Sequence, residues 1–443
     1  MIHKHSVLLI FLALFVPALP AEAASWNQAD YVRKVLQASP ELETARQDLD
    51  RARRRKTSTL ATAWLPNAAA SASAIPYGHN PQNQYAFAKW KTESDEVSYN
   101  ANVSLNLFNS FKDHWAFKTA ALETRLADVE LLRAVRETVL KALETFHHLI
   151  LKNKNLAAFE QNLQMQRDQH EMAQNLYKQG LRSLFDIQKT QVDLYSTEQR
   201  LLGVRNDARL ALAKFNWLIE RPGEEAAQAQ EPDRPKPGSI PGFDDSWSLA
   251  LRQKPELINA RLRVDKARIE TRVRGQKLFP DLNVKADWNW QNSATFGLPS
   301  KQFGIPEKNY QVSAVLSYSF GLGHIAQWQD YMGAAAQHKA AQAAERETQR
   351  RIKEEILTAI LELERLGASY AISARKESLV KENAAYVQER YSQGSAGILE
   401  LTQAQQDLLS AQLEQAQVIK DYHLAVMKYK IAVGTPLDEE ALE

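Results

Sequence analysis

The segment Leu176-Tyr177-Lys178-Gln179-Gly180 recurs later in the chain as Arg390-Tyr391-Ser392-Gln393-Gly394, and this repetition decides the fold. The same register places Asp186 against Glu400, Gln191 against Gln405 and Leu194 against Leu408. Upstream, Ser39-Pro40-Glu41-Leu42 recurs as Lys254-Pro255-Glu256-Leu257, with the spacing shifted by one residue. The sequence therefore predicts a tandem duplication of one large unit, rather than the many short repeats of a solenoid.

The first residues have the pattern of an export signal. His3-Lys4-His5 precedes the apolar run 7–16, and Ala21-Glu22-Ala23 offers small residues for cleavage near residue 23 or 24. The chain has no cysteine, so we expect neither a lipid anchor nor a disulfide. No later stretch approaches the roughly 18 to 20 apolar residues of a spanning helix. The net charge of +2 indicates no polyanionic partner such as nucleic acid.

These observations divide the chain into five expected parts. The signal peptide occupies residues 1–24, the first repeat 25–221, a linker 222–243, the second repeat 244–434 and a C-terminal tail 435–443. Each repeat is expected to contain two strands and long helices.

Four segments show the period-two pattern of strands. Apolar residues alternate with Ser and Asn over 97–107, and the second repeat shows the same alternation over 282–290 and 312–320. The segment Asn67 to Ile75 is rich in Ala and Ser and has the weakest pattern. Such alternation is typical of transmembrane barrel strands, although a half-buried strand of a soluble sandwich is the alternative. The export signal and the lack of further strands favour the barrel.

Four strands are too few to close a barrel, since the smallest single-chain barrels have about eight. We therefore expect three copies of the chain to contribute to one barrel of twelve strands. The connections 76–95 and 292–309 are rich in Pro, Gly, Asn and Gln and are expected to be surface loops on the extracellular side.

The rest of the chain is expected to be helical. Residues 112–179 contain neither Pro nor Gly, and a helix of that length would span about 100 Å. Helices over 26–63 and 182–220 would stack beside it, and the second repeat would follow with 327–393 and 398–433. Leu184, Ile187, Leu194 and Leu201 have coiled-coil spacing and are read as core positions. Helices this long predict a tube rather than a compact core.

The repeated glycines lie where each long helix should end. Gly180 and Gly394 fit the left-handed position that terminates a helix, and Ser183 is a candidate N-cap with Asp186 three residues on. With the duplication and the strands, these turns make the chain resemble the TolC-like outer-membrane efflux protein family. The matching residues include Tyr177 to Leu181, Arg390 to Gly394, and the junctions Leu107-Phe108-Asn109 and Ser319-Phe320-Gly321.

The resemblance implies a homotrimer in the outer membrane of a Gram-negative cell, with a 12-stranded barrel continued by a periplasmic α-helical tunnel. It implies a passive exit duct for a tripartite efflux or type I secretion system, which receives substrates from an inner-membrane transporter through a periplasmic adaptor. The family's adaptor-docking tip corresponds to Gly180, Leu181, Ser183, Gly394 and Ser395. Its entrance constriction corresponds to Asp186, Tyr391 and Glu400, where a ring of carboxylates would favour cations.

Two positions depart from the latch of the family's best-known member, because Ala396 stands at the position of its Arg and Gln403 at a second, acidic position nearby. Asp186 and Glu400 are also explained by the favourable interaction of acidic residues with a helix N-terminus. The sequence leaves the transported substrate, the transporter class and the resting state of the tip open.

Functions other than that of a duct receive little support from the sequence. A periplasmic coiled-coil adaptor without a pore is the alternative, but the alternating segment around Trp288 argues against it. An enzyme on a helical bundle is the third class, yet we find no phosphate-binding loop, nucleophile elbow or HExxH motif. His147-His148 lies in mid-helix without a partner at ligand spacing, so we assign no catalytic residue, metal or cofactor.

Overall fold

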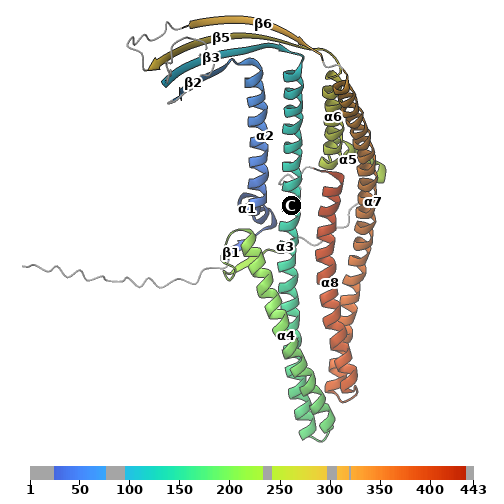
Figure 1. The fold of residues 1–443 in the computed structure, drawn as a ribbon. Helices are drawn as coiled ribbons and strands as arrows, with labels where there is room; N and C mark the ends of the chain where they lie inside the picture. The colour runs from blue at the N-terminus through green and yellow to red at the C-terminus, as the bar shows by residue number, and fades with distance from the viewer. Residues whose placement is uncertain (1–23, 76–94, 233–241, 297–306, 319–320, 436–443) are drawn as a thin grey trace, which may run out of the picture.

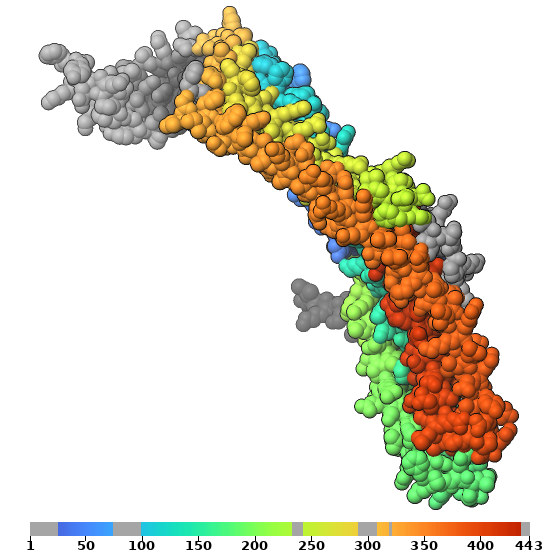
Figure 2. All heavy atoms as spheres, turned by 90° about the vertical axis from the view of Figure 1, so that its right-hand side faces the viewer, coloured from blue at the N-terminus to red at the C-terminus, as the bar shows by residue number. Residues whose placement is uncertain are grey.

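The computed structural model describes residues 24–75, 95–232, 242–296, 307–318 and 321–435. The subunit is long and bowed, with a β-sheet at one end and two helical turns at the other (Figures 1 and 2). The predicted signal peptide up to residue 23 lies outside the described residues, as do parts of the linker and tail. Residues 76–94 of the first predicted connection and 297–306 of the second also lie outside them, whereas 292–296 and 307–309, predicted as connection, belong to strands. None of the described helices is long and apolar enough to span a membrane.

A single antiparallel sheet has the order β2-β3-β5-β6. Its strands are β2 (Asn67–Ile75), β3 (Asp95–Asn109), β5 (Asp281–Phe296) and β6 (Glu307–Ser317). The central pair β3 and β5 joins the two repeats, with Val103 opposite Trp288. The four predicted strands are confirmed, although β6 ends at Ser317 rather than at 320, a residue outside those described. The helices continue from the strand ends and do not cover a face of the sheet (Figure 1).

Within the described residues, each repeat supplies four helices. The first has α1 (Gln28–Ala38), α2 (Pro40–Trp64), α3 (Lys112–Lys178) and α4 (Leu184–Leu218). The second has α5 (Phe243–Gln253), α6 (Pro255–Gln276), α7 (Leu322–Ser392) and α8 (Ile398–Val433). Two short strands, β1 (Ala24–Trp26) and β4 (Ala227–Ala229), pair in parallel beside them.

The long helices form one layer from the sheet to the turns. Nearest the sheet the neighbours run α2, α3, α6, α7, which is the order of the strands that these helices continue. Beyond the middle, α4 replaces α2 beside α3, and α8 replaces α6 beside α7. The predicted stacking of two shorter helices along each long one is therefore confirmed.

The continuous helix predicted over 26–63 is wrong, because the chain breaks at Ser39. Pro40 lacks an N–H and disfavours helical geometry in the residue before it, so Ser39 adopts φ −69° and ψ 117°. The Ser39 side chain instead accepts a bond from the Leu42 N–H and begins α2. Lys254 before Pro255 has nearly the same backbone angles, so both repeats bend at the same place. The second long helix also begins earlier than predicted, at Leu322 instead of 327.

The main core lies in the middle of the layer, where the short helices α1 and α5 pack. The rings of Tyr31 and Phe215 stack with centroids 4.0 Å apart, and the Tyr31 hydroxyl donates to the Phe215 carbonyl. In the second repeat, the hydroxyls of Ser246 and Tyr429 lie 2.8 Å apart. Equivalent helices are thus joined in both repeats. The aromatic hydroxyl belongs to Tyr31 of α1 in the first repeat and to Tyr429 of α8 in the second.

Candidate functional site at the hairpin tips

Both tips are helix-terminating turns built on a left-handed glycine. Gly180 has φ 76°, and its N–H donates to the Tyr177 carbonyl, while the Leu181 N–H donates to Leu176. Gly394 has φ 80°, with the same pair of bonds from Gly394 and Ser395 to residues of α7. This is the Schellman pattern, which favours a residue without a Cβ. The predicted turns are therefore confirmed.

The five residues predicted for docking are all exposed, but the two tips differ in character. The first tip presents a cluster of apolar side chains with exposed fractions from 44 to 66%: Tyr177, Leu181, Leu184 and Phe185. The second presents Ser392, Gln393 and Ser395, with Leu399 beyond them. The prediction that Leu184 is a core residue is thus wrong, whereas the same prediction for Leu201 is confirmed, because Leu201 is buried. Ser183 is the N-cap residue of α4, as predicted, but its side chain makes no capping hydrogen bond.

Tyr391 is fully buried inside the second hairpin. Its ring packs with Val387, Ala396 and Leu401, and its hydroxyl has no partner among the described residues. Burial raises the pKa of the Tyr391 phenol, and the nearby Asp186 raises it further, while Arg182 lowers it. Asp186 is itself only 8% exposed. Because its charge acts on the Tyr391 phenol, the structure brings Asp186 and Tyr391, two predicted constriction residues, together across the two hairpins.

Arg182 joins the two tips and was not anticipated from the sequence. Its guanidinium donates to the carbonyls of Ala396 and Tyr391, at 2.7 and 3.2 Å. Its guanidinium carbon also lies 4.5 Å from the centre of the Tyr391 ring. A cation between Gly180 and Asp186 was the available signal, but only the fold shows which residues it reaches.

Glu400, the third predicted constriction residue, is paired within its own hairpin. Arg390 Nη1 lies 2.8 Å from Glu400 Oε1, and the Arg390 guanidinium also covers the ring of Tyr386. Glu400 and Asp186 therefore have different environments. Glu400 is ion-paired at the surface, whereas Asp186 is buried. The repeat pairs these two positions in sequence, yet it does not give them the same environment.

Above the tips, α3 and α8 meet along a seam of buried amides. Gln166 Nε2 donates to Gln405 Oε1 over 3.0 Å, while both polar atoms of Gln169 lack a partner among the described residues. On the α4 side, His170 bonds Thr190 at 2.9 Å. Unpartnered buried amides destabilise a contact, so this seam is weaker than the apolar packing within the second hairpin.

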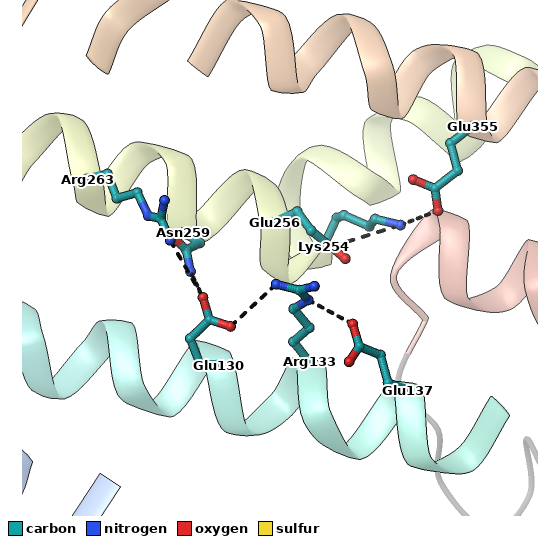
Figure 3. Close-up of polar contacts among 8 residues, drawn as sticks. All are labelled: Glu130, Arg133, Glu137, Lys254, Glu256, Asn259, Arg263 and Glu355. Carbon is teal, nitrogen blue, oxygen red and sulfur yellow. Dashed lines mark hydrogen bonds and ion pairs between the residues drawn. The ribbon is translucent and has the colours of Figure 1, made fainter. Parts of the chain in front are cut away.

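A second polar network ties the middle of the layer together (Figure 3). Lys254 is 1% exposed, and its Nζ lies 2.8 Å from Glu355 Oε1 on α7 and 3.3 Å from the Ile431 carbonyl on α8. Glu130 on α3 reaches Asn259 at 2.6 Å and Arg263 at 3.8 Å, both on α6. This network fixes α3, α6, α7 and the end of α8 where the helix order changes.

His147 does have a partner, although a distant one in the sequence. Its ring stacks on His423 of α8, with centroids 5.0 Å apart and an angle of 14°. Burial and the neighbouring His423 lower the pKa of His147 to about 3, and burial also lowers the pKa of His423. Among the described residues, no three His, Asp or Glu side chains are grouped so as to hold a metal.

The duplicated plan, the four-stranded sheet and the two tips are the features expected of the outer-membrane efflux protein class. A family model for outer membrane efflux proteins matches residues 31–216 and again 247–434, and the chain belongs to this family. The alkaline protease secretion protein AprF of Pseudomonas aeruginosa is 23% identical over 362 residues, covering 80% of this chain and 73% of AprF.

Solved structures show the same fold. The outer membrane protein VceC of Vibrio cholerae superposes with a TM-score of 0.78 at 19% identity, covering 92% of this chain and 96% of VceC. The CmeC outer membrane channel of Campylobacter jejuni gives 0.78 at 14% identity, covering 93% and 87%. The resemblance inferred from the repeated turns is confirmed at the level of family and fold.

Proposed function

We propose that this chain forms the exit duct of a tripartite efflux or type I secretion system, as a homotrimer in the outer membrane. Three subunits would close a 12-stranded barrel above a periplasmic helical tunnel. The duct would conduct substrates passively, because a transporter in the inner membrane and a periplasmic adaptor supply both energy and cargo.

The observation that carries this proposal is the match between the two open edges of the helical layer. α4 and α7 are the outermost helices below the middle, and each carries exposed apolar residues. Tyr195 follows Gly180 by as many residues as Leu379 precedes Gly394. The same equality holds for Leu202 with Ile372 and for Trp217 with Leu357.

Such matched stripes suit a head-to-tail contact. Because both turns lie at the same end, equal distances from the glycines put the paired residues at about the same height. Among the residues that the structure describes, no strand pairs with the outer sides of the edge strands β2 and β6. A contact between different surfaces closes a ring when the rotation is right, and three bowed subunits would bury all three pairs.

The contact can be tested by disulfide formation, since the chain has no cysteine of its own. Leu202→Cys with Ile372→Cys should give covalent dimers and trimers on oxidation in intact cells. Leu202→Cys with Leu357→Cys is the matched control, because both positions are exposed but differ by about 20 Å in height. Absence of linked trimers, or equal linking in the control, would contradict the ring.

The docking role of the tips needs a separate test. We propose that Gly180, Leu181, Ser183, Gly394 and Ser395 contact the adaptor, and that Asp186, Tyr391 and Glu400 lie at the entrance. A photo-crosslinker at Leu181 should capture an adaptor in living cells, whereas one at the exposed Arg263 near the middle should not. Capture of only the chain's own subunits at 181 would leave a pore without a docked partner.

A further inference from the structure

A groove between α3 and α6 lies close to the sheet and is not used by the proposed duct. It has a volume of about 370 Å³ and opens between the first turns of α3 and the last turns of α6. Its walls are rows of residues three or four apart on one side of each helix. The lining comprises Trp115, Lys118, Ala121, Leu122, Arg125, Asp265, Arg268, Ile269 and Arg272.

The groove carries four cations and one carboxylate. Arg268 lies 3.9 Å from Asp265, whereas Lys118, Arg125 and Arg272 have no ion pair among the described residues. The Lys118 Nζ and the Arg272 guanidinium instead lie over the Trp115 ring, at 5.2 and 5.8 Å from its centre. The Trp115 Nε1 is buried and also lacks a partner there. The groove therefore offers an anion several unused donors.

The groove faces away from the hollow side of the layer. A hollow of about 720 Å³ is lined by residues of α2, α3, α6 and α7 together, as expected on the concave side of a curved layer. It uses Ala116, Ala120 and Glu123 of α3, and shares only Trp115 with the groove. The groove is reached by α3 and α6 alone, so it opens on the convex side.

The groove lies at the level where the border of a membrane around the sheet is expected. This step rests on the proposed function. Lys118 and Arg272 lie within about 10 Å of the helix ends that join β3 and β5. The headgroup layer extends roughly 5 to 8 Å beyond the hydrocarbon. Phe111 and Phe279, 59 and 70% exposed, stand at those junctions, where aromatic residues favour the interface.

We propose that this groove binds the phosphate headgroup of an anionic phospholipid in the periplasmic leaflet. Arg268 and Arg272 have planar donor groups that suit phosphate oxygens, Lys118 adds a point charge, and Trp115 lies at the interface. Because α3 and α6 are the central helices of the layer, each subunit would carry its own site, away from the contacts between subunits.

The test measures lipid retained by the full-length protein in detergent, by native mass spectrometry after incubation with phosphatidylglycerol or phosphatidylcholine. The wild type should retain the anionic lipid at least about tenfold better. Lys118→Gln, Arg268→Gln and Arg272→Gln combined should remove that preference. Arg375→Gln, Lys376→Gln and Lys381→Gln, which remove the same charge lower on α7, should keep it.

Each other outcome has a distinct meaning. Equal retention of both lipids by the wild type, or an unchanged preference in the groove variant, would overturn the headgroup site. Stabilisation of the delipidated protein by inorganic phosphate as strongly as by phosphatidylglycerol would assign the groove to a free anion and overturn the lipid assignment. A protein that is extracted without detergent and retains neither lipid would instead contradict the proposed membrane location.

Discussion

The guanidinium of Arg182 lies on the ring of Tyr391, and this contact joins the tip of the first hairpin to that of the second. Two hydrogen bonds to carbonyls of the second hairpin accompany it. The carbonyl that Arg182 reaches belongs to Ala396, the position where the resemblance led us to expect a latch Arg. A cation from the first tip thus makes the connection, whereas Arg390 of the second tip pairs with Glu400 in its own hairpin.

We predict that Arg182→Gln raises the resting conductance of the duct in planar bilayers. A cation–π contact contributes about 0.5 to 2 kcal/mol, and the loss of 2 kcal/mol would shift the ratio of joined to separated tips roughly thirtyfold. Lys178→Gln removes an exposed cation of the same tip and should leave conductance unchanged. Equal conductance in both variants would show that the contact does not hold the tip.

At Tyr391 the ring is expected to matter more than the hydroxyl. Tyr391→Phe keeps the buried ring and the surface for Arg182, and it removes a hydroxyl without a partner among the described residues, so thermal stability should change little. Tyr391→Ala should cost about 3 to 5 kcal/mol, because a fully buried aromatic side chain leaves a cavity. A large loss in the Phe variant would reveal a bond made by the hydroxyl in the assembled trimer.

Stability should fall on acidification because of His147. Its pKa is lowered to about 3 in the folded chain, from 6.5. The unfolded state therefore binds the proton first, and the stabilisation present above pH 6.5 is lost progressively as the pH falls towards 3. At pH 5 the loss from this group is about 2 kcal/mol.

The measurement is the melting temperature between pH 7.5 and 5, compared with His147→Phe. The variant should show a smaller decrease, while His338→Gln, which changes a half-buried histidine far along α7 from this site, should follow the wild type. His423, His148, Lys420, Lys154 and Glu231 surround the site and set the remaining slope. Parallel curves for all three proteins would refute the role of His147.

Lys254 should be far more sensitive to substitution than the surface cations. Lys254→Ala removes a buried side chain that binds Glu355 and the end of α8, with an expected cost of roughly 2 to 4 kcal/mol in urea unfolding. Lys376→Ala breaks an exposed pair with Glu414 and should cost less than about 1 kcal/mol. Similar costs at the two sites would argue against the central network.

Local chemistry explains what the sequence predicted well. The period-two pattern over 97–107 and the Pro- and Gly-free run 112–179 depend on neighbouring residues, and both became β3 and α3. The left-handed turns at Gly180 and Gly394 follow from the absence of a Cβ, which is also a local property. The helix break at Ser39 was missed even though its signal, the following Pro40, was local as well.

The tertiary structure alone decided which distant residues meet. Asp186 and Glu400 are equivalent in the repeat, yet one is buried beside Tyr391 and the other pairs with Arg390 at the surface. Periodicity gives the face of a helix but not the helix it will pack against. For that reason Arg182 with Tyr391 and His147 with His423 could be found only once the two repeats were placed side by side. Lys254 with Glu355 could be found only once the helices within the second repeat were packed together.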